Sequence, residues 1–156
     1  DIVGGGSMEE DLHLSIEVNK LSNTRAHGWL LPSETQALYK RANVFILPSY
    51  KEGFPNSLLE AMSFGLAPIV TGVGGIPDVI KDMVNGRIIE ARSPGSIEKA
   101  MRGYIEDKSL LHKHAELSWV SVKQNHSVRE SVNELVKIGQ TTRRNEHDRH
   151  AKKQQP

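Results

Sequence analysis

The sequence predicts an α/β fold in which helices cover both faces of a parallel sheet, a doubly wound, Rossmann-like arrangement. Three short apolar runs, at residues 44–47, 67–70 and 87–89, each end next to residues that break regular structure. Strands that are covered on both faces carry such continuous runs, whereas strands with one wet face alternate. Helical stretches lie between the runs, and this alternation favours parallel strands joined by right-handed crossovers.

The remaining elements follow from caps, breakers and helical spacing. A strand ends at Ile2-Val3 before a glycine turn at 4–6, and apolar residues with helical spacing follow it. The sequence Ser33-Glu34-Thr35-Gln36 has capping-box spacing and predicts a helix that starts at Ser33. Pro55 and Gly65 bracket another helix, in the usual order of proline first and glycine last. Three helices are expected after Ser93, with Ile97, Met101 and Ile105 as the buried stripe of the first, then 110–122 and 127–135.

Composition indicates one globular domain over residues 1–138, followed by a disordered basic tail at 139–156. The chain has 156 residues, of which 37% are hydrophobic and 25% charged, and its net charge is +1. Most of the excess positive charge lies in the tail, so we expect no nucleic-acid binding. The absence of cysteine excludes disulfides and thiolate metal sites. We expect a cytoplasmic location, no metal and no cofactor.

The segment from Leu47 to Gly65 carries the chemistry. It runs from a strand through a loop into a helix, and ligands of open parallel sheets bind beyond the carboxyl ends of the strands. The first helical turn, at 56–58, has unpaired backbone N–H groups and the positive end of the helix dipole, so it can receive a diphosphate. Gly53 would let the backbone approach a ligand closely.

Two carboxylates flank this helix start. Glu52 precedes it, and Glu60 lies about 7.5 Å into the helix at ~1.5 Å per residue. Carboxylates accept hydrogen bonds from sugar and ribose hydroxyls, so the order sugar, diphosphate, ribose fits a nucleotide sugar. Alternatively, two isolated glutamates are solvated residues of a loop and of a wet helix face.

The blocks around these glutamates resemble a known family. Pro48-Ser49, Glu52-Gly53-Phe54-Pro55-Asn56 and Leu59-Glu60-Ala61-Met62 resemble the E-x(7)-E signature of the large glycogen-synthase-like family of retaining glycosyltransferases, the glycosyl transferases group 1. The stretches 70–80 and 85–89 are similar to the next two blocks of that family. The resemblance implies the C-terminal, donor-binding lobe of a GT-B fold, with the first strand of that lobe missing.

The resemblance also assigns roles to individual residues. It implies that Glu52 contacts the donor sugar and Glu60 the ribose hydroxyls. A backbone loop that includes Trp29 and Leu30 would read the nucleobase, although an aromatic residue at a strand end more often packs. The remaining donor-binding positions are Gly53, Phe54, Asn56, Leu58 and Leu59.

The family's partners are implied in the same way. The donor is a nucleotide diphosphate sugar, and the acceptor is a sugar, a lipid or a polysaccharide. An N-terminal lobe would hold the acceptor, the catalytic histidine of many relatives and any peripheral membrane contact. Because that histidine lies in the other lobe, no catalytic residue is assigned here. An Arg and a Lys that bind the diphosphate in relatives precede the matched region. A non-catalytic nucleotide-sugar-binding or regulatory module, or one chain of a split enzyme, remain alternatives.

Three other sequence patterns give weaker evidence of a functional site. The glycines at 4–6 do not fit G-x-G-x-x-G, because Glu9 stands where the last glycine belongs. His112 and His114 would point to different sides of a helix, so we expect surface residues rather than a metal pair. Asp78 is expected to cap a short helix or to stay solvated, and Gly74-Gly75 form either a plain turn or a close approach to the ligand.

Overall fold

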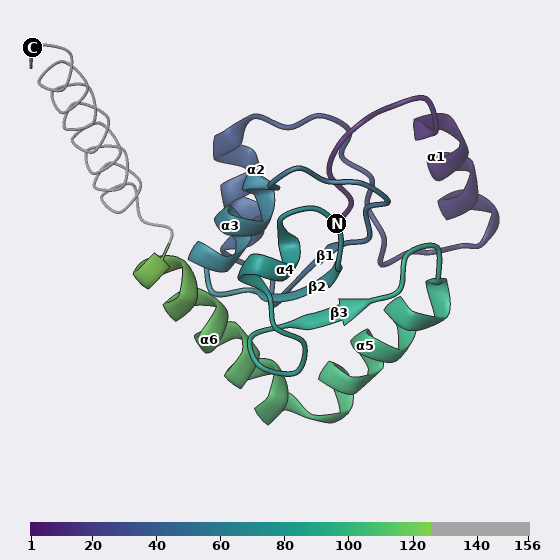
Figure 1. Cartoon of the computed structure of the whole chain (residues 1–156). Coiled ribbons are helices and arrows are strands. Elements are labelled where there is room, and N and C mark those ends of the chain that lie inside the picture. Colours follow the sequence, from purple (N-terminus) through teal and green to yellow (C-terminus); the bar gives the residue numbers. More distant parts are fainter. Residues whose placement is uncertain (126–156) are drawn as a thin grey trace, which may run out of the picture.

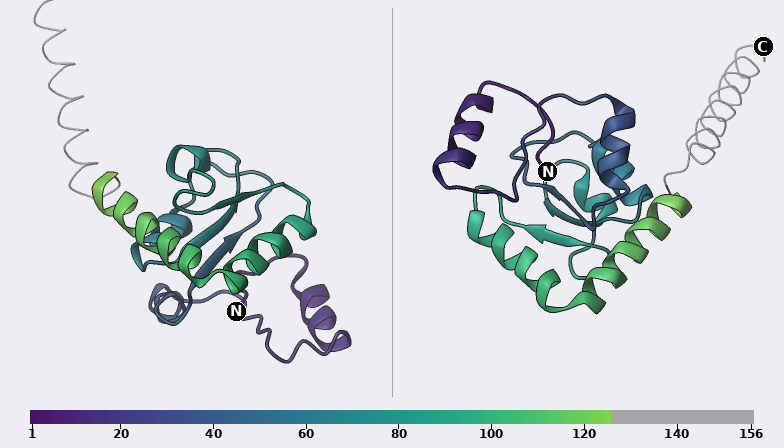
Figure 2. Two further views of the ribbon diagram at one scale, coloured as in Figure 1. Left: turned by 90° about the horizontal axis from the view of Figure 1, so that it is seen from below. Right: turned by 180° about the vertical axis from the view of Figure 1, so that it is seen from behind.

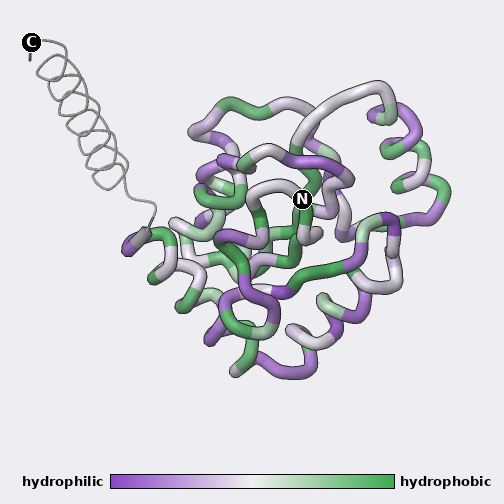
Figure 3. The backbone as a smooth tube through the Cα atoms, in the orientation of Figure 1, coloured by the Kyte–Doolittle hydropathy of each residue, from purple (hydrophilic) through white to green (hydrophobic). Residues whose placement is uncertain are grey.

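A computed structural model describes residues 1–125, so the helix predicted at 127–135 and the tail predicted at 139–156 lie outside the described part. The predicted strands form a parallel three-stranded sheet in the order β1-β2-β3. They are β1 (Val44–Leu47), β2 (Ala67–Thr71) and β3 (Arg87–Ile89). Figure 1 shows the sheet at the centre of the molecule, and Figure 3 shows the hydrophobic stretch along β3.

Helices cover both faces of this sheet, as a doubly wound fold requires (Figures 1 and 2). Helices α3 (Asn56–Ser63) and α4 (Ile76–Val79) pack on one face, where Val70 of β2 joins their buried side chains. Helix α5 (Pro94–Glu106) and the start of α6 (Lys108–Asn125) pack on the other face, against Ala67 and Ile69. All five residues of β2 are buried, which explains its continuous apolar run.

The first part of the chain packs more loosely. Helix α1 (Glu9–Val18) has no buried residue, and the strand expected at Ile2-Val3 is a single parallel bridge to Ala26. The expected strand at Ile2-Val3 is therefore not part of the three-stranded sheet. Helix α2 (Pro32–Tyr39) starts before Ser33, because the carboxylate of Glu34, not Gln36, accepts the N–H of Leu31 at 2.7 Å.

One further expectation about the helices was wrong in part. In α5 the buried residues are Ala100 and Tyr104, and Ile97 packs against the core beside them, whereas Met101 and Ile105 are 42% and 64% exposed. The helix is therefore rotated away from the stripe that the sequence predicted.

Asp78 has the second of its two expected roles. It lies inside α4, where Gly75 occupies the N-cap position, and its side chain is exposed to solvent.

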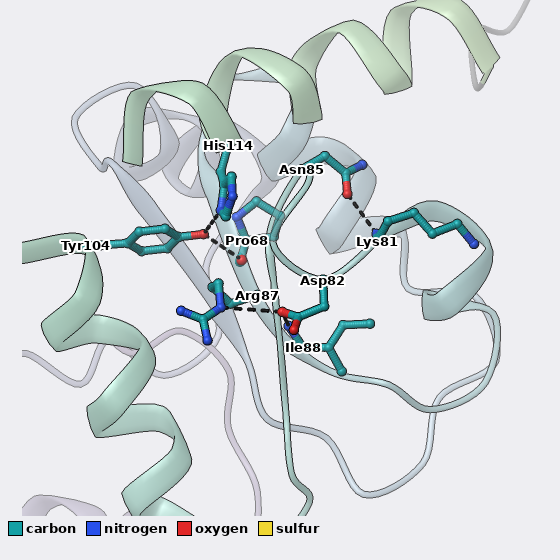
Figure 4. A network of polar contacts seen from close by, with 8 residues as sticks. All are labelled: Pro68, Lys81, Asp82, Asn85, Arg87, Ile88, Tyr104 and His114. Atoms are coloured by element: carbon teal, nitrogen blue, oxygen red, sulfur yellow. Dashed lines mark hydrogen bonds and ion pairs between the residues drawn. The ribbon is translucent and has the colours of Figure 1, made fainter. Parts of the chain in front are cut away.

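A polar contact ties α5, α6 and β2 together inside the core (Figure 4). The hydroxyl of Tyr104 lies 2.8 Å from Nδ1 of His114 and 3.5 Å from the carbonyl oxygen of Pro68. His114 is completely buried, which corrects the expectation of a surface residue, whereas His112 is exposed. The Nε2 atom of His114 has no hydrogen-bond partner among residues 1–125. Burial lowers the pKa of His114, and a backbone contact from Met83 offsets this effect only in part.

We expect the free energy of unfolding to fall as the pH drops below about 6.5, the ordinary pKa of histidine. The lowered pKa of folded His114 means that the unfolded chain binds the proton more readily. Above about pH 6.5, His114 is neutral in both states and does not reduce the free energy of unfolding. Between that pH and the lower pKa of folded His114, the free energy of unfolding falls by up to about 1.4 kcal/mol per pH unit.

Urea unfolding at pH 5, 6 and 7 measures this dependence. The slope should decrease in His114→Gln and stay unchanged in His112→Gln, the exposed neighbour on the same helix. An equal slope in His114→Gln and in the native chain would show that another group causes the dependence.

Candidate donor-binding site

The loop between β1 and α3 holds Glu52 through Ser49. The Ser49 hydroxyl donates to Oε1 of Glu52 at 2.5 Å, and the Ser49 carbonyl accepts from Oγ1 of Thr71 at 2.6 Å. Thr71 is buried at the end of β2, so the two bonds tie the loop to the carboxyl end of the neighbouring strand. Glu52 is half-buried, and Ser49 fixes one of its two carboxylate oxygens.

The turn after β2 packs against the same loop. Gly74 has a φ of +59°, and a Cβ at this position would overlap the carbonyl oxygen of Glu52. The N–H of Gly75 donates to the carbonyl oxygen of Gly53 at 2.8 Å, and a Cβ on Gly75 would lie 2.6 Å from the ring of Phe54. These glycines therefore permit contact between two loops, which neither predicted role covers. Gly53 itself has open space where its Cβ would be.

The start of α3 suits an anion. Pro55 is the N-cap and provides no side-chain cap, and among residues 1–125 the N–H groups of Asn56 and Ser57 donate to no other group. The first turn of α3 contains no acidic residue. Free N–H groups and the positive helix dipole favour a phosphate at this point.

Glu60 lies one turn further along α3 and is exposed together with Asn56. On the opposite side of the helix, Leu58 and Met62 are buried in the core and Leu59 is half-buried. Burial raises the pKa of Tyr39, and the negative charge of Glu60 adds to this effect.

A separate open hollow of about 820 Å³ lies beside the glycines at 4–6 and the start of α1. The first turn of α1 contains Glu9, Glu10 and Asp11, which repel an anion, so a diphosphate is favoured at α3 and not here. Trp29 is 83% exposed, and its indole edge and the Glu9 carboxylate both lie close to the Cα of Gly5. Leu30 is half-buried. Base binding by Trp29 and Leu30 stays a prediction.

The structure brings some predicted residues together and adds others. It places Glu52, Gly53, Phe54 and the first turn of α3 in one loop-helix unit. Phe54 is 46% exposed and lies beside Gly75. Ser49 and Thr71 stand in the segments that resemble the family, but the sequence did not indicate that they support Glu52. A hydroxyl residue at each of two adjacent strand ends was the available signal.

No helix within residues 1–125 is long and apolar enough to cross a membrane. The described residues also contain no group of three or more His, Asp or Glu side chains placed to hold a metal ion.

The family model and the similar proteins all point to glycosyltransferases. The model of the family "Glycosyl transferases group 1" matches residues 1–118. The chain is 32% identical over 111 residues to an Escherichia coli UDP-Gal:alpha-D-GlcNAc-diphosphoundecaprenol alpha-1,3-galactosyltransferase, covering 70% of this chain and 28% of that protein. It is 29% identical over 109 residues to a Campylobacter jejuni N,N'-diacetylbacillosaminyl-diphospho-undecaprenol alpha-1,3-N-acetylgalactosaminyltransferase, with coverage of 70% and 28%. The chain thus spans less than a third of these relatives.

Solved structures agree on the fold. The C-terminal domain of a glycosyl transferase group 1 family protein from Francisella tularensis superposes with a TM-score of 0.71 at 26% identity, covering 78% of this chain and 63% of that one. An Anabaena protein in complex with UDP-glucose superposes with a TM-score of 0.78 at 20% identity, covering 90% of this chain and 40% of that one. The chain therefore belongs to the glycosyl transferases group 1 and has the fold of the C-terminal lobe of GT-B glycosyltransferases.

Proposed function

We propose that this chain is the donor-binding lobe of a glycosyltransferase that transfers a sugar from a nucleotide diphosphate sugar with retention of configuration. The observation that carries this proposal is the unit formed by Glu52, the uncapped start of α3 and Glu60. The sugar would contact Glu52, the diphosphate the free N–H groups of Asn56 and Ser57, and the ribose Glu60. The UDP-sugar donors named for relatives support a nucleotide-sugar ligand.

The proposed enzyme also needs an acceptor and a second lobe, and the sheet of this chain has a free edge at β1. Strand β1 pairs only with β2 among the described residues, and all four of its apolar residues are half-buried, compared with complete burial in β2. An edge strand with free N–H and C=O groups can pair with a further strand. This edge can therefore take one further strand of the same sheet. A second lobe, with a sheet of its own, would hold a sugar, lipid or polysaccharide acceptor. A cytoplasmic location stays a prediction.

We expect Glu60→Gln to weaken binding of the nucleoside diphosphate by roughly 1–3 kcal/mol, because the ribose hydroxyls lose a charged acceptor. Glu60 is exposed, so the helix should remain intact. Calorimetric titration with UDP, GDP and ADP and their common sugars identifies the base and measures the loss.

Glu52→Gln is the matched variant, since glutamine keeps an oxygen that can accept the Ser49 hydroxyl. It should reduce only the additional affinity that the sugar contributes. Equal weakening of the free nucleoside diphosphate by both variants would contradict the order of sugar, phosphate and ribose along this segment. A chain that binds none of the nucleotides would refute the donor-binding function itself.

The alternative of a non-catalytic binding module has one observation in its favour. Residues 1–125 contain the proposed donor contacts but no assigned general acid or base. Supplying a second lobe distinguishes the two functions, because only a transferase would then turn over donor.

A further inference from the structure

Tyr50 and Arg92 form a contact beside Glu52 that the donor site described above does not use. The guanidinium of Arg92 lies 5.2 Å from the centre of the Tyr50 ring, within the range of a cation-π contact. Tyr50 belongs to the loop after β1 and is 68% exposed, and Arg92 is an exposed residue of the loop after β3. The pair therefore spans the carboxyl edge of the sheet, above the end of β2.

The backbone at both ends holds this pair in place. The carbonyl of Ser49, next to Tyr50, is fixed by Thr71 at the end of β2. Arg92 has a φ of +60°, a left-handed conformation that is uncommon for residues other than glycine. Residues kept in such a conformation often serve a site and must be held there by their surroundings.

The Arg92 guanidinium has no ion-pair partner within residues 1–125, whereas Arg41, Arg87 and Arg102 each contact a carboxylate. Stacking on a ring uses the face of a guanidinium and leaves its in-plane N–H groups free. Those groups match the two oxygens of a carboxylate and bind them bidentately. The pair thus offers an anion a cation that has no ion-pair partner among residues 1–125.

We propose that Arg92, stacked on Tyr50, selects a donor whose sugar carries a carboxylate, that is, a nucleotide diphosphate uronic acid. The inference rests on the proposed function, in which the sugar lies at Glu52 and the diphosphate at the start of α3. Tyr50 adjoins Ser49, whose hydroxyl binds Glu52, whereas the proposed phosphate site at the start of α3 follows Glu52 in the chain. We therefore place the pair at the sugar end of the donor. A carboxylate at C6 of a hexose is an anion that can occupy this end.

Calorimetric titration of the full chain tests the proposal. UDP, GDP and ADP first identify the accepted base, and a uronate is then compared with its neutral hexose: UDP-glucuronate with UDP-glucose, or GDP-mannuronate with GDP-mannose. We expect the uronate to bind at least about tenfold more tightly, the usual effect of a charge-assisted hydrogen bond. Equal binding, or tighter binding of the neutral sugar, would overturn the proposal.

Variants separate charge recognition from loop structure. Arg92→Gly removes the cation and fits the φ of +60° without strain, so it should fold and bring the ratio of uronate to hexose affinity to about one. Arg92→Lys keeps the charge but loses the planar fork, so an intermediate ratio is expected. Arg102→Ala, which removes an exposed arginine paired with Glu98 on α5, should keep the native ratio.

The titrations separate a failure of the proposed role of Arg92 from a failure of the donor-binding function. If no nucleotide binds, the donor-binding function fails and this inference fails with it. If UDP or GDP binds but the uronate preference is absent, or persists in Arg92→Gly, only the role of Arg92 is refuted.

Discussion

Residues 1–156 alone are expected to transfer no sugar above the uncatalysed background. In the proposed function the chain provides one wall of a two-lobed cleft, and closure of such a cleft normally excludes water and aligns donor with acceptor. Well-oriented reactants reach effective molarities of about 10⁵–10⁸ M, so an open half-site loses most of the acceleration. Within residues 1–125 the proposed diphosphate site is a helix N-terminus, an interaction worth ~0.3–1 kcal/mol.

Adding the partner lobe, as a covalent fusion or as a second chain, should restore transfer to a suitable acceptor. If the added chain also carries a strand that pairs with the free edge of β1, the backbone amides of Val44–Leu47 should become protected against hydrogen exchange. Sugar transfer by the purified chain, with a control for trace contaminants, would contradict the proposal that this chain is one lobe of a two-lobed enzyme.

Gly74→Ala is expected to destabilise the chain by about 1–3 kcal/mol and to remove the sugar's contribution to binding. Alanine is strained at a φ of +59°, and its Cβ would overlap the Glu52 carbonyl oxygen. The loop that carries Glu52 must then move, and the carboxylate that Ser49 fixes moves with it. Thermal unfolding measures the first effect, and titration with nucleotide and nucleotide sugar the second.

Gly95→Ala is the matched control, because Gly95 lies in the first turn of α5 and has open space where a Cβ would be. It should leave both measurements unchanged or raise the melting temperature slightly, since alanine favours a helix. A Gly74→Ala chain that binds the nucleotide sugar as tightly as the native chain would show that Glu52 is not positioned through this contact.

The sequence predicted the strands and α3 well because continuous apolar runs and the Pro55–Gly65 bracket are local signals. The stripe of α5 was wrong for a different reason. Ile97, Met101 and Ile105 have the right spacing, but of these three only Ile97 packs against the core. The buried face is formed by Ala100 and by Tyr104, whose hydroxyl reaches His114. A small residue and a polar aromatic residue do not stand out in a hydrophobic pattern, so only the packed structure reveals that face.

The site was predictable in the same uneven way. Glu52 and Glu60 could be proposed as site residues because they stand in blocks that resemble a family. The support of Glu52 was missed, because Ser49 and Thr71 are 22 positions apart and meet through parallel pairing of β1 and β2. The contact of Gly74 with the Glu52 loop likewise depends on tertiary structure, and the sequence left that glycine between two roles.

Backbone amide chemical shifts recorded during titration with the accepted nucleoside diphosphate test the central claim most directly. The account predicts that the largest shifts fall on Asn56, Ser57 and Glu60, at the start and first turns of α3. Shifts concentrated at the hollow beside Gly4–Gly6 and α1, with the amides of α3 unaffected, would place the diphosphate elsewhere and contradict it.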